Sequence, residues 1–258
     1  MHAPDFNFEP AVRDPKKLRN TALILVGVML LGGWLVLKAY EKWSVSQSGD
    51  NRPAVIYRIT KERDLRILRQ DGETVDLADL RGKVIAINVT SLRDSEAAAV
   101  SNDVMKRLAA ARAKTAEFQL VSLVLDPLPA EKLSQTLRET AVEQEMNLPQ
   151  WWLGSNEPKT LHKFIKNELK ANLYPNEIDG KWNYDPSIVL IDKNGHIRRA
   201  VVPQKQGGPP FIATFDFAQA ASWDEKGAKT GTERSNTQEL ELLLNQTIDK
   251  LLIEPFKP

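Results

Sequence analysis

Cysteine is absent from this sequence of 258 residues, and histidine occurs three times, as His2, His162 and His196. The absence of thiols excludes disulfides, thiol catalysis, CxxC redox chemistry and every zinc or iron–sulfur site with cysteine ligands. No two histidines are close in sequence, so neither a histidine-rich metal site nor a histidine-based catalytic triad is expected. Most enzyme classes are therefore excluded, and no catalytic residue, cofactor or metal is predicted.

An excess of charge of one sign is also lacking. Lysine and arginine number 35, aspartate and glutamate 34, and the formal net charge is +1. This balance provides no overall field to attract nucleic acid, which we do not expect as a partner. With 42% hydrophobic and 27% charged residues, the chain is neither disordered nor wholly embedded in a membrane.

One long stretch carries no charge. Residues 21–37 read TALILVGVMLLGGWLVL, and Ala39 and Tyr40 extend the stretch beyond Lys38 to about the 20 residues that span a bilayer. The alternatives are a buried core helix and a cleaved signal peptide. A signal peptide has a shorter apolar region, typically about 7–15 residues, and a small-residue cleavage site, which LKAYEKW lacks. We therefore predict an uncleaved transmembrane helix at residues 21–40.

The charges beside this span predict its orientation. Four basic residues precede it, whereas Lys38 and Lys42 follow it together with Glu41. Because positive charge accumulates on the cytoplasmic side, residues 1–20 are expected to form a cytoplasmic tail. The C-terminal domain is then periplasmic, in the inner membrane of a bacterium, and the lipid bilayer is a partner.

The exported part alternates between apolar strands and amphipathic helices, which indicates the α/β class. We predict a linker or N-terminal extension at 41–69, in which residues 54–68 form a strand or a short helix, and a globular domain at 70–258 that contains a long loop at 203–236. Its expected elements are strands at 84–89 and 118–125, a helix at about 95–114, a helix after Pro129, a short strand at 151–153, a helix at 161–173, a hairpin of 187–191 with 196–202, and a last helix with a capping box at Ser235 and Gln238.

Three segments carry a family resemblance. GETVDLADLRGKVIAINV (72–89) is similar to the lead-in of peroxiredoxin-like thioredoxin folds, and LVSLVLDPLPAEKL (120–133) resembles a segment of Sco/SenC copper chaperones. SIVLIDKNGHIRRA (187–200) resembles the hairpin that Sco and TlpA-type proteins share. The resemblance covers about residues 70–202 and the last helix. It implies a thioredoxin-like domain with a central mixed sheet flanked by helices, held by a single N-terminal anchor.

The sequence departs from Sco proteins at all three copper ligands. Ungapped counting from Gly82 and Lys83 places Asp94 and Ala98 where the family has its two cysteines, and Tyr184 where it has its histidine. Copper(I) prefers thiolate or thioether sulfur, which a lone carboxylate does not replace. Copper transfer by the family mechanism is therefore not expected.

Pro186 precedes the strand SIVLI with the spacing of the thioredoxin cis-proline. We expect a cis peptide bond there; the alternative is a trans proline at the start of a strand, where the missing N–H does no harm.

Other polar and aromatic residues have ordinary structural explanations. Asp94 and Glu96 are expected to cap a helix, in preference to acid–base catalysis or metal binding. His162 is expected to be a surface or half-buried residue of an amphipathic helix, and His196 to lie at the start of a strand. The tryptophans at 151, 152 and 182 are expected in the core, or alternatively in a patch for a partner.

Together these observations predict a non-enzymatic, membrane-anchored protein without a small-molecule substrate. The resemblance implies an accessory subunit or assembly factor of a respiratory membrane complex such as cytochrome oxidase, whose membrane subunits would be its partners. One alternative is a residual low-affinity copper chaperone that uses Asp94, Glu96, Asp185 or Met105. A second is a thiol-independent enzyme such as a hydrolase, although no nucleophile–base pair can be named.

Overall fold

The computed structural model describes residues 14–48, 52–93, 96–204, 210–228 and 233–257. Two compact units divide the chain, one of residues 1–51 with 203–210 and the other of residues 52–202 with 211–258. In the first unit, a single helix, α1, runs from Pro15 to Ser48. Its part from Pro15 to Ala39 is long and apolar enough to cross a membrane, and apolar side chains such as Met29 are mostly exposed in it. A helix of this kind needs an apolar environment.

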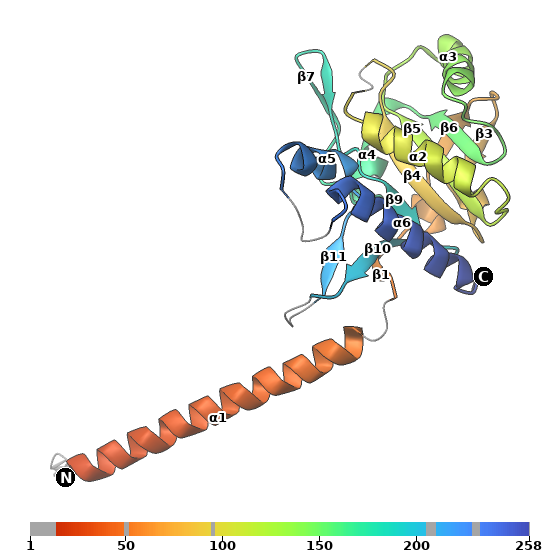
Figure 1. Cartoon of the computed structure of the whole chain (residues 1–258). Coiled ribbons are helices and arrows are strands. Elements are labelled where there is room, and N and C mark those ends of the chain that lie inside the picture. Colours follow the sequence, from red (N-terminus) through yellow and green to blue (C-terminus); the bar gives the residue numbers. More distant parts are fainter. Residues whose placement is uncertain (1–13, 49–51, 94–95, 205–209, 229–232, 258) are drawn as a thin grey trace, which may run out of the picture. The chain divides into compact units, whose positions relative to one another are not determined.

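The second unit is built on a large sheet (Figure 1). Among the described residues its strand order is β1-β10-β9-β4-β5-β6-β2-β3, with β11 paired to β10, while β7 and β8 form a separate hairpin. The strands are β1 (Ala54–Arg58), β2 (Arg66–Arg69), β3 (Thr74–Asp76), β4 (Val84–Thr90), β5 (Phe118–Val124), β6 (Trp151–Ser155), β7 (Asn176–Ile178), β8 (Lys181–Asn183), β9 (Val189–Ile191), β10 (His196–Val202) and β11 (Phe211–Ala213).

The connections define a thioredoxin-like fold. Strands β4, β5 and β6 are parallel neighbours, joined by α2 and then α3, and β9 and β10 form an antiparallel hairpin beside β4. The closing helix follows this hairpin in the chain. The predicted fold class is therefore confirmed. The helices are α2 (Ala99–Ala111), α3 (Ala130–Glu143), α4 (Pro158–Asn167), α5 (Phe217–Glu225) and α6 (Asn236–Ile253), with short 3-10 turns η1 (Lys61–Arg63) and η2 (Leu77–Leu80).

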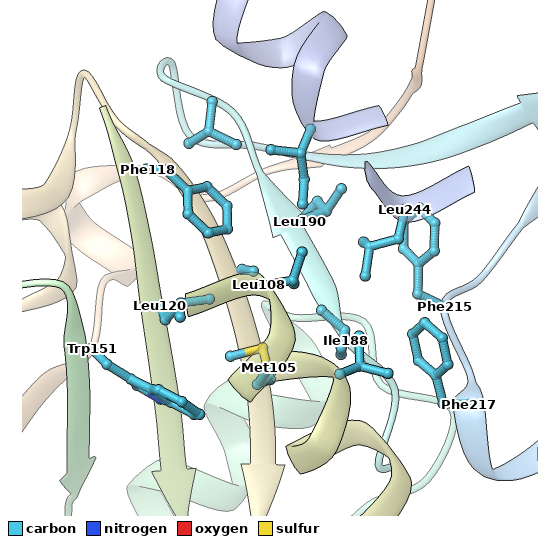
Figure 2. Packing of buried hydrophobic residues seen from close by; sticks show 14 of the residues in the cluster. Met105, Leu108, Phe118, Leu120, Trp151, Ile188, Leu190, Phe215, Phe217 and Leu244 are labelled. Carbon is cyan, nitrogen blue, oxygen red and sulfur yellow. The ribbon is translucent and has the colours of Figure 1, made fainter. Parts of the chain in front are cut away.

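Apolar side chains pack on both faces of the sheet, because residues of a buried strand alternate between its two faces. On one face, Leu108 of α2 and Leu244 of α6 pack with Phe118 and Leu120 of β5. Figure 2 shows these side chains converging between the helices and the strands. On the other face, α4 and η2 cover a second cluster that includes Val121 of the same strand. The central strands β4 and β5 are thus fully buried.

A chain of buried polar groups attaches α2 to the sheet. Asn88 of β4 donates from Nδ2 to Oδ1 of Asn102 on α2 at 2.7 Å, and its own Oδ1 accepts from Oγ of Ser122 at 2.6 Å. The indole of Trp151 donates to the same Ser122 oxygen at 3.0 Å. Since buried polar groups are costly unless they are bonded, this network fixes where α2 lies on the sheet.

The predicted linker or N-terminal extension, 41–69, contains part of the sheet. Strand β1 pairs with β10, and β2 pairs with both β3 and β6. Both strands lie near the edges of the sheet and are only partly buried, and basic side chains interrupt their apolar pattern. A strand was one of the two alternatives predicted for residues 54–68, and the structure has strands at 54–58 and 66–69.

The long loop predicted at 203–236 is also partly structured. It contains β11 and α5, whose first turn is capped by Asp216, with Oδ1 accepting from the Gln219 amide at 2.9 Å. Phe217 and Ala220 are buried, so this short helix is stabilised by packing. The capping box of Ser235 and Gln238 at the start of α6 is confirmed.

Helix α4 begins and ends earlier than predicted. The Glu157 carboxylate caps it by accepting from the amides of Lys159 and Thr160, at 3.1 Å and 2.8 Å. Lys170 has a positive φ of 60°, so the chain has left the helix before residue 173.

Candidate functional site

The candidate site is the loop that follows β4, where Sco proteins carry their copper-binding cysteines. Asp94 lies outside the described residues. Ala98 is buried at the N-cap of α2, and Tyr184 is buried in the same apolar cluster on that face of the sheet. The structure thus brings two of the three family positions into one cluster, but the first contributes a methyl group and the second a phenol.

A buried carboxylate, Asp126, occupies the centre of this region just beyond β5. Its side chain is 1% exposed and accepts from Ser91 Oγ at 3.1 Å and from the Leu92 amide at 2.5 Å. Arg93 Nε donates to it at 2.8 Å and Trp182 Nε1 at 3.2 Å. Four donors from two segments therefore meet on one carboxylate, which holds the start of the loop closed.

Arg93 and Trp182 join this loop to the β7–β8 hairpin. The guanidinium of Arg93 lies 5.7 Å from the centre of the Trp182 ring, within the range of a cation–π contact. The same guanidinium pairs with Glu177 of β7 at 3.4 Å. Asp179 and Gly180 both have positive φ, 50° and 77°, which makes the tight turn of this hairpin. The hairpin projects from the rest of the domain in Figure 1. Its buried Trp182 is what attaches it there.

His162 lies on α4 beside the same indole. Its ring meets Trp182 edge-on with centres 5.2 Å apart, and Tyr174 in the same way at 6.0 Å. Burial lowers the pKa of His162, against a hydrogen bond to the Leu125 backbone and the charge of Glu157, which raise it. Its Nε2 has no hydrogen-bond partner among the described residues. The predicted position near the surface was wrong, because the imidazole is buried among aromatic rings.

The other residues considered as ligands do not converge. Met105 is fully buried in the apolar cluster under α2, and Asp185 uses both carboxylate oxygens on the amides of Ser187 and Asn172, at 3.0 Å and 2.7 Å. Glu96 is exposed. Within the described residues, no group of three or more histidine, cysteine or acidic side chains is placed to hold a metal ion.

Among the described residues, no acidic side chain caps the start of helix α2. Ala98 is its N-cap residue and makes no side-chain bond, and the backbone carbonyl of Glu96, not its carboxylate, accepts from the Ala99 amide at 3.1 Å. The predicted capping role of Glu96 was therefore wrong. Two polar residues of the helix itself position it. Asn102 accepts from Asn88, and Ser101 donates from Oγ to the Pro186 carbonyl at 2.8 Å.

The expected cis bond before Pro186 is not present. Among the described residues the cis peptide bond is Leu148–Pro149. The backbone around Pro186 is instead held by Asp185, whose carboxylate accepts from the amides of Ser187 and Asn172. His196 starts β10 as predicted, and the three tryptophans at 151, 152 and 182 are core residues.

The sequence reasoning missed Asp126, Arg93 and Trp182 as one unit. The signal for Asp126 was a charged residue directly after a continuous apolar strand, since a buried carboxylate needs partners. The partners themselves lie 33 and 56 residues away in the chain, so their identity depends on the tertiary fold.

Comparison with known proteins gives structural likenesses only. No protein-family model matches the chain, and neither does any curated protein. Similar solved structures include a SCO1/SenC family lipoprotein from Bacillus anthracis, with 16% identity, a TM-score of 0.49, and coverage of 73% of this chain and 92% of that one. Another is ScoI from Bradyrhizobium japonicum with copper bound, with 16% identity, a TM-score of 0.45, and coverage of 70% of this chain and 96% of that one. A third is BsSco, a member of the Sco family of cytochrome c oxidase assembly proteins, with 14% identity, a TM-score of 0.48, and coverage of 77% of this chain and 97% of that one.

Proposed function

We propose that this protein is a non-catalytic, membrane-anchored thioredoxin-like protein that serves a respiratory membrane complex, such as cytochrome oxidase, as an accessory subunit or assembly factor. The observation that carries the proposal is the closure of the loop after β4 by Asp126 and Arg93. Where the resemblance places the copper site of a Sco protein, this chain has an ion pair of Arg93 and Asp126, and Asp126 also accepts from Ser91, Leu92 and Trp182.

Because the loop is closed and contains no sulfur ligand, we infer that the domain acts by binding a protein partner. The pair of Asp126 and Arg93 stabilises the loop in one conformation, and no thiol exists in the chain to carry electrons or copper(I). The retained fold, with its projecting β7–β8 hairpin, supplies surface for a protein partner.

Helix α1 and the charges beside it support the proposed location. Its apolar stretch supports insertion into a bilayer, and the basic residues before residue 21 favour a cytoplasmic N-terminus. We place the domain in the periplasm, where it can reach the exported faces of integral membrane subunits.

The alternative, a low-affinity copper chaperone, has little support from the described residues. Met105 has no exposed surface, and the oxygens of Asp185 are already bonded. A chaperone also needs a ligand set that exchanges with a partner, and in the described part of the second unit the thioether sulfurs belong to the buried Met105 and Met146.

The test is co-purification from native membranes. The full chain with a C-terminal tag is solubilised in mild detergent and captured, and the eluate is examined by mass spectrometry and metal analysis. We expect one respiratory complex in a fixed ratio and no copper on the released protein. Recovery of the protein alone with stoichiometric copper that resists chelation would overturn the proposal in favour of the chaperone. Arg93→Ala with Glu177→Ala should weaken the association if the hairpin takes part in it, while the matched exposed pair Arg66→Ala with Asp76→Ala, between strands β2 and β3, should not.

A further inference from the structure

A small cavity on the α4 side of the sheet has the chemistry of an anion site. It measures about 30 Å³ and lies between the turn after α4, the segment that leads into β9, and β10. A site for one water needs roughly 10–15 Å³ by this kind of measure, so the cavity has room for a group of a few heavy atoms. We propose that it binds a carboxylate carried on a short apolar stem.

The inner surface of the cavity is apolar. It is formed by side chains from β4, α4, β9 and β10 and by Phe215, namely Ile87, Val89, Ile165, Val189 and Ile197. A ligand group that reaches these residues is therefore a methyl or methylene group, which gains free energy by leaving water.

Two cationic side chains around the cavity, Lys170 and Arg199, can donate hydrogen bonds to a ligand. Lys170 and Arg199 are half-buried, and neither forms an ion pair within the part of the chain that the structure describes. The ammonium of Lys170 lies 3.7 Å from the centre of the Tyr57 ring, which holds it by a cation–π contact without neutralising it. Two cations beside one cavity without an anionic partner favour an anionic ligand.

A third donor belongs to Ser187, which also lines the cavity. Ser187 is 8% exposed, and its Oγ is buried with no hydrogen-bond partner among the described residues. Leaving such a hydroxyl unsatisfied is unfavourable, so a ligand oxygen that accepts a hydrogen bond from it removes this cost.

The acidic residues nearby do not remove the preference for an anion. Asp185 also lines the cavity, but its two oxygens accept from the amides of Ser187 and Asn172. Asp216 is next to Asp185, and its pKa is raised by burial despite the Gln219 and Ala218 amides, with Asp185 adding to the rise. Its carboxylate is used as the cap of α5, so neither acid supplies the missing partner of the two cations.

The walls are held in place before any ligand arrives. Lys166 donates from Nζ to the carbonyls of Ala171 and Asn172, at 3.1 Å and 2.9 Å, and the Asn172 amide is fixed on Asp185. A site that is already ordered loses little conformational entropy on binding. This inference names only the chemistry of the ligand and does not depend on the proposed function.

Two sources can provide such a group: an acidic side chain of a protein, or a free short-chain carboxylic acid. The experiment uses the full chain in detergent micelles, with labelled isoleucine and valine methyl groups, and follows Val189 and Ile197 by NMR. Sodium butyrate and the peptide acetyl-Ala-Glu-Ala-amide are titrated separately, against butylammonium chloride and the corresponding glutamine peptide at equal ionic strength.

We expect saturable shifts with a carboxylate ligand and none with its matched control. Saturation with butyrate alone identifies a free acid as the ligand, and saturation with the glutamate peptide identifies a protein side chain. Lys170→Gln and Arg199→Gln should each weaken binding at least tenfold, and Ser187→Ala several-fold, whereas Lys132→Gln on the exposed side of α3 should not. Shifts that are absent, that never saturate or that are equal for the controls overturn the proposal, provided that the other methyl signals show a folded domain.

Discussion

Arg93 lies with its Nε 2.8 Å from Oδ1 of Asp126, so that a half-exposed cation closes the loop after β4 over an anion that is 1% exposed. The two residues are unequal partners. Arg93 can turn into water when the pair is broken, whereas Asp126 is the acceptor on which the loop and the hairpin both depend. The geometry therefore predicts different results for changes on the two sides.

Asp126→Ala should destabilise the domain by about 3 kcal/mol, because the Leu92 amide and the Trp182 indole lose their acceptor inside the protein. The midpoint of thermal unfolding should fall by roughly 6–12 °C for a domain of this size. Circular dichroism or calorimetry on the full chain measures it. Glu177→Gln, which breaks only the exposed contact to Arg93, should change the stability by less than about 1 kcal/mol. Equal effects of the two variants would contradict the central role of Asp126.

His162 should make the domain less stable in mild acid. Its pKa in the folded protein is lowered from 6.5, mainly by burial, so the unfolded chain binds the proton more readily. Stability therefore rises with pH between the lowered pKa and about 6.5, is fully present above this window, and declines as pH falls through it. Urea unfolding at pH 7.5 and 5.5 measures the difference, which His162→Gln should reduce. His196→Gln is the control, and an unchanged pH dependence in the His162 variant would argue against this assignment.

Arg198 should be among the most sensitive residues of the sheet. Its side chain is 6% exposed and pairs with Asp192, 2% exposed, and with Glu254, both at 2.7 Å. Arg198→Met leaves a buried carboxylate without its cation, at an expected cost of about 3–5 kcal/mol. Arg66→Met breaks the surface pair with Asp76 and should cost less than about 1 kcal/mol. Chemical denaturation of the two variants compares them, and similar midpoints would refute the difference.

Gly195→Ala should disturb the turn of the β9–β10 hairpin. Gly195 has a φ of 82°, which costs a residue with a side chain about 1–2 kcal/mol. An added methyl group would also overlap the guanidinium of Arg81, which donates to the Ile59 carbonyl at 2.6 Å. Gly180→Ala has a similar φ of 77° with open space around it, so it isolates the backbone strain. We expect the Gly195 variant to unfold at lower denaturant than the Gly180 variant, and the reverse order would rule out the Arg81 overlap.

The central part of the fold could be predicted because its signals are local. Strands β4 and β5 are continuous apolar runs, the sequence DKNG forms the hairpin turn, and Ser235 with Gln238 marks the start of α6. Helix α5 was missed, and strand β1 was left open as a strand or a short helix, for the opposite reason. Each is short and stabilised by a partner distant in the chain: Ala54 pairs with Arg199, and Asp224 of α5 accepts from the amides of Asn236 and Thr237.

The sequence predicted that the candidate site lacks the copper ligands of Sco proteins, but it did not predict the Asp126 network that is found there. Counting from Gly82 located the loop, and the absence of thiols followed from composition. The Asp126 network joins the residue just beyond β5 with the loop after β4 and with β8, and no sequence pattern specifies that Trp182 donates to this carboxylate. The side chain of His162 was misplaced for a similar reason, since Tyr174 and Trp182 cover it from outside its own helix.

The contact of Arg198 with Pro53 gives the domain a mechanical property. Its Nε and Nη2 hold the Pro53 carbonyl at 3.1 Å and 2.8 Å, just where the chain enters β1, while the same guanidinium holds Glu254 beyond α6. A pull transmitted along the chain from the N-terminal side reaches this clamp before it reaches β1. The force is then shared with Asp192 at the hairpin turn and Glu254 after the last helix, because both bind the same guanidinium. Strand β1 therefore stays paired at the edge of the sheet until the hydrogen bonds of Arg198 to Pro53 break.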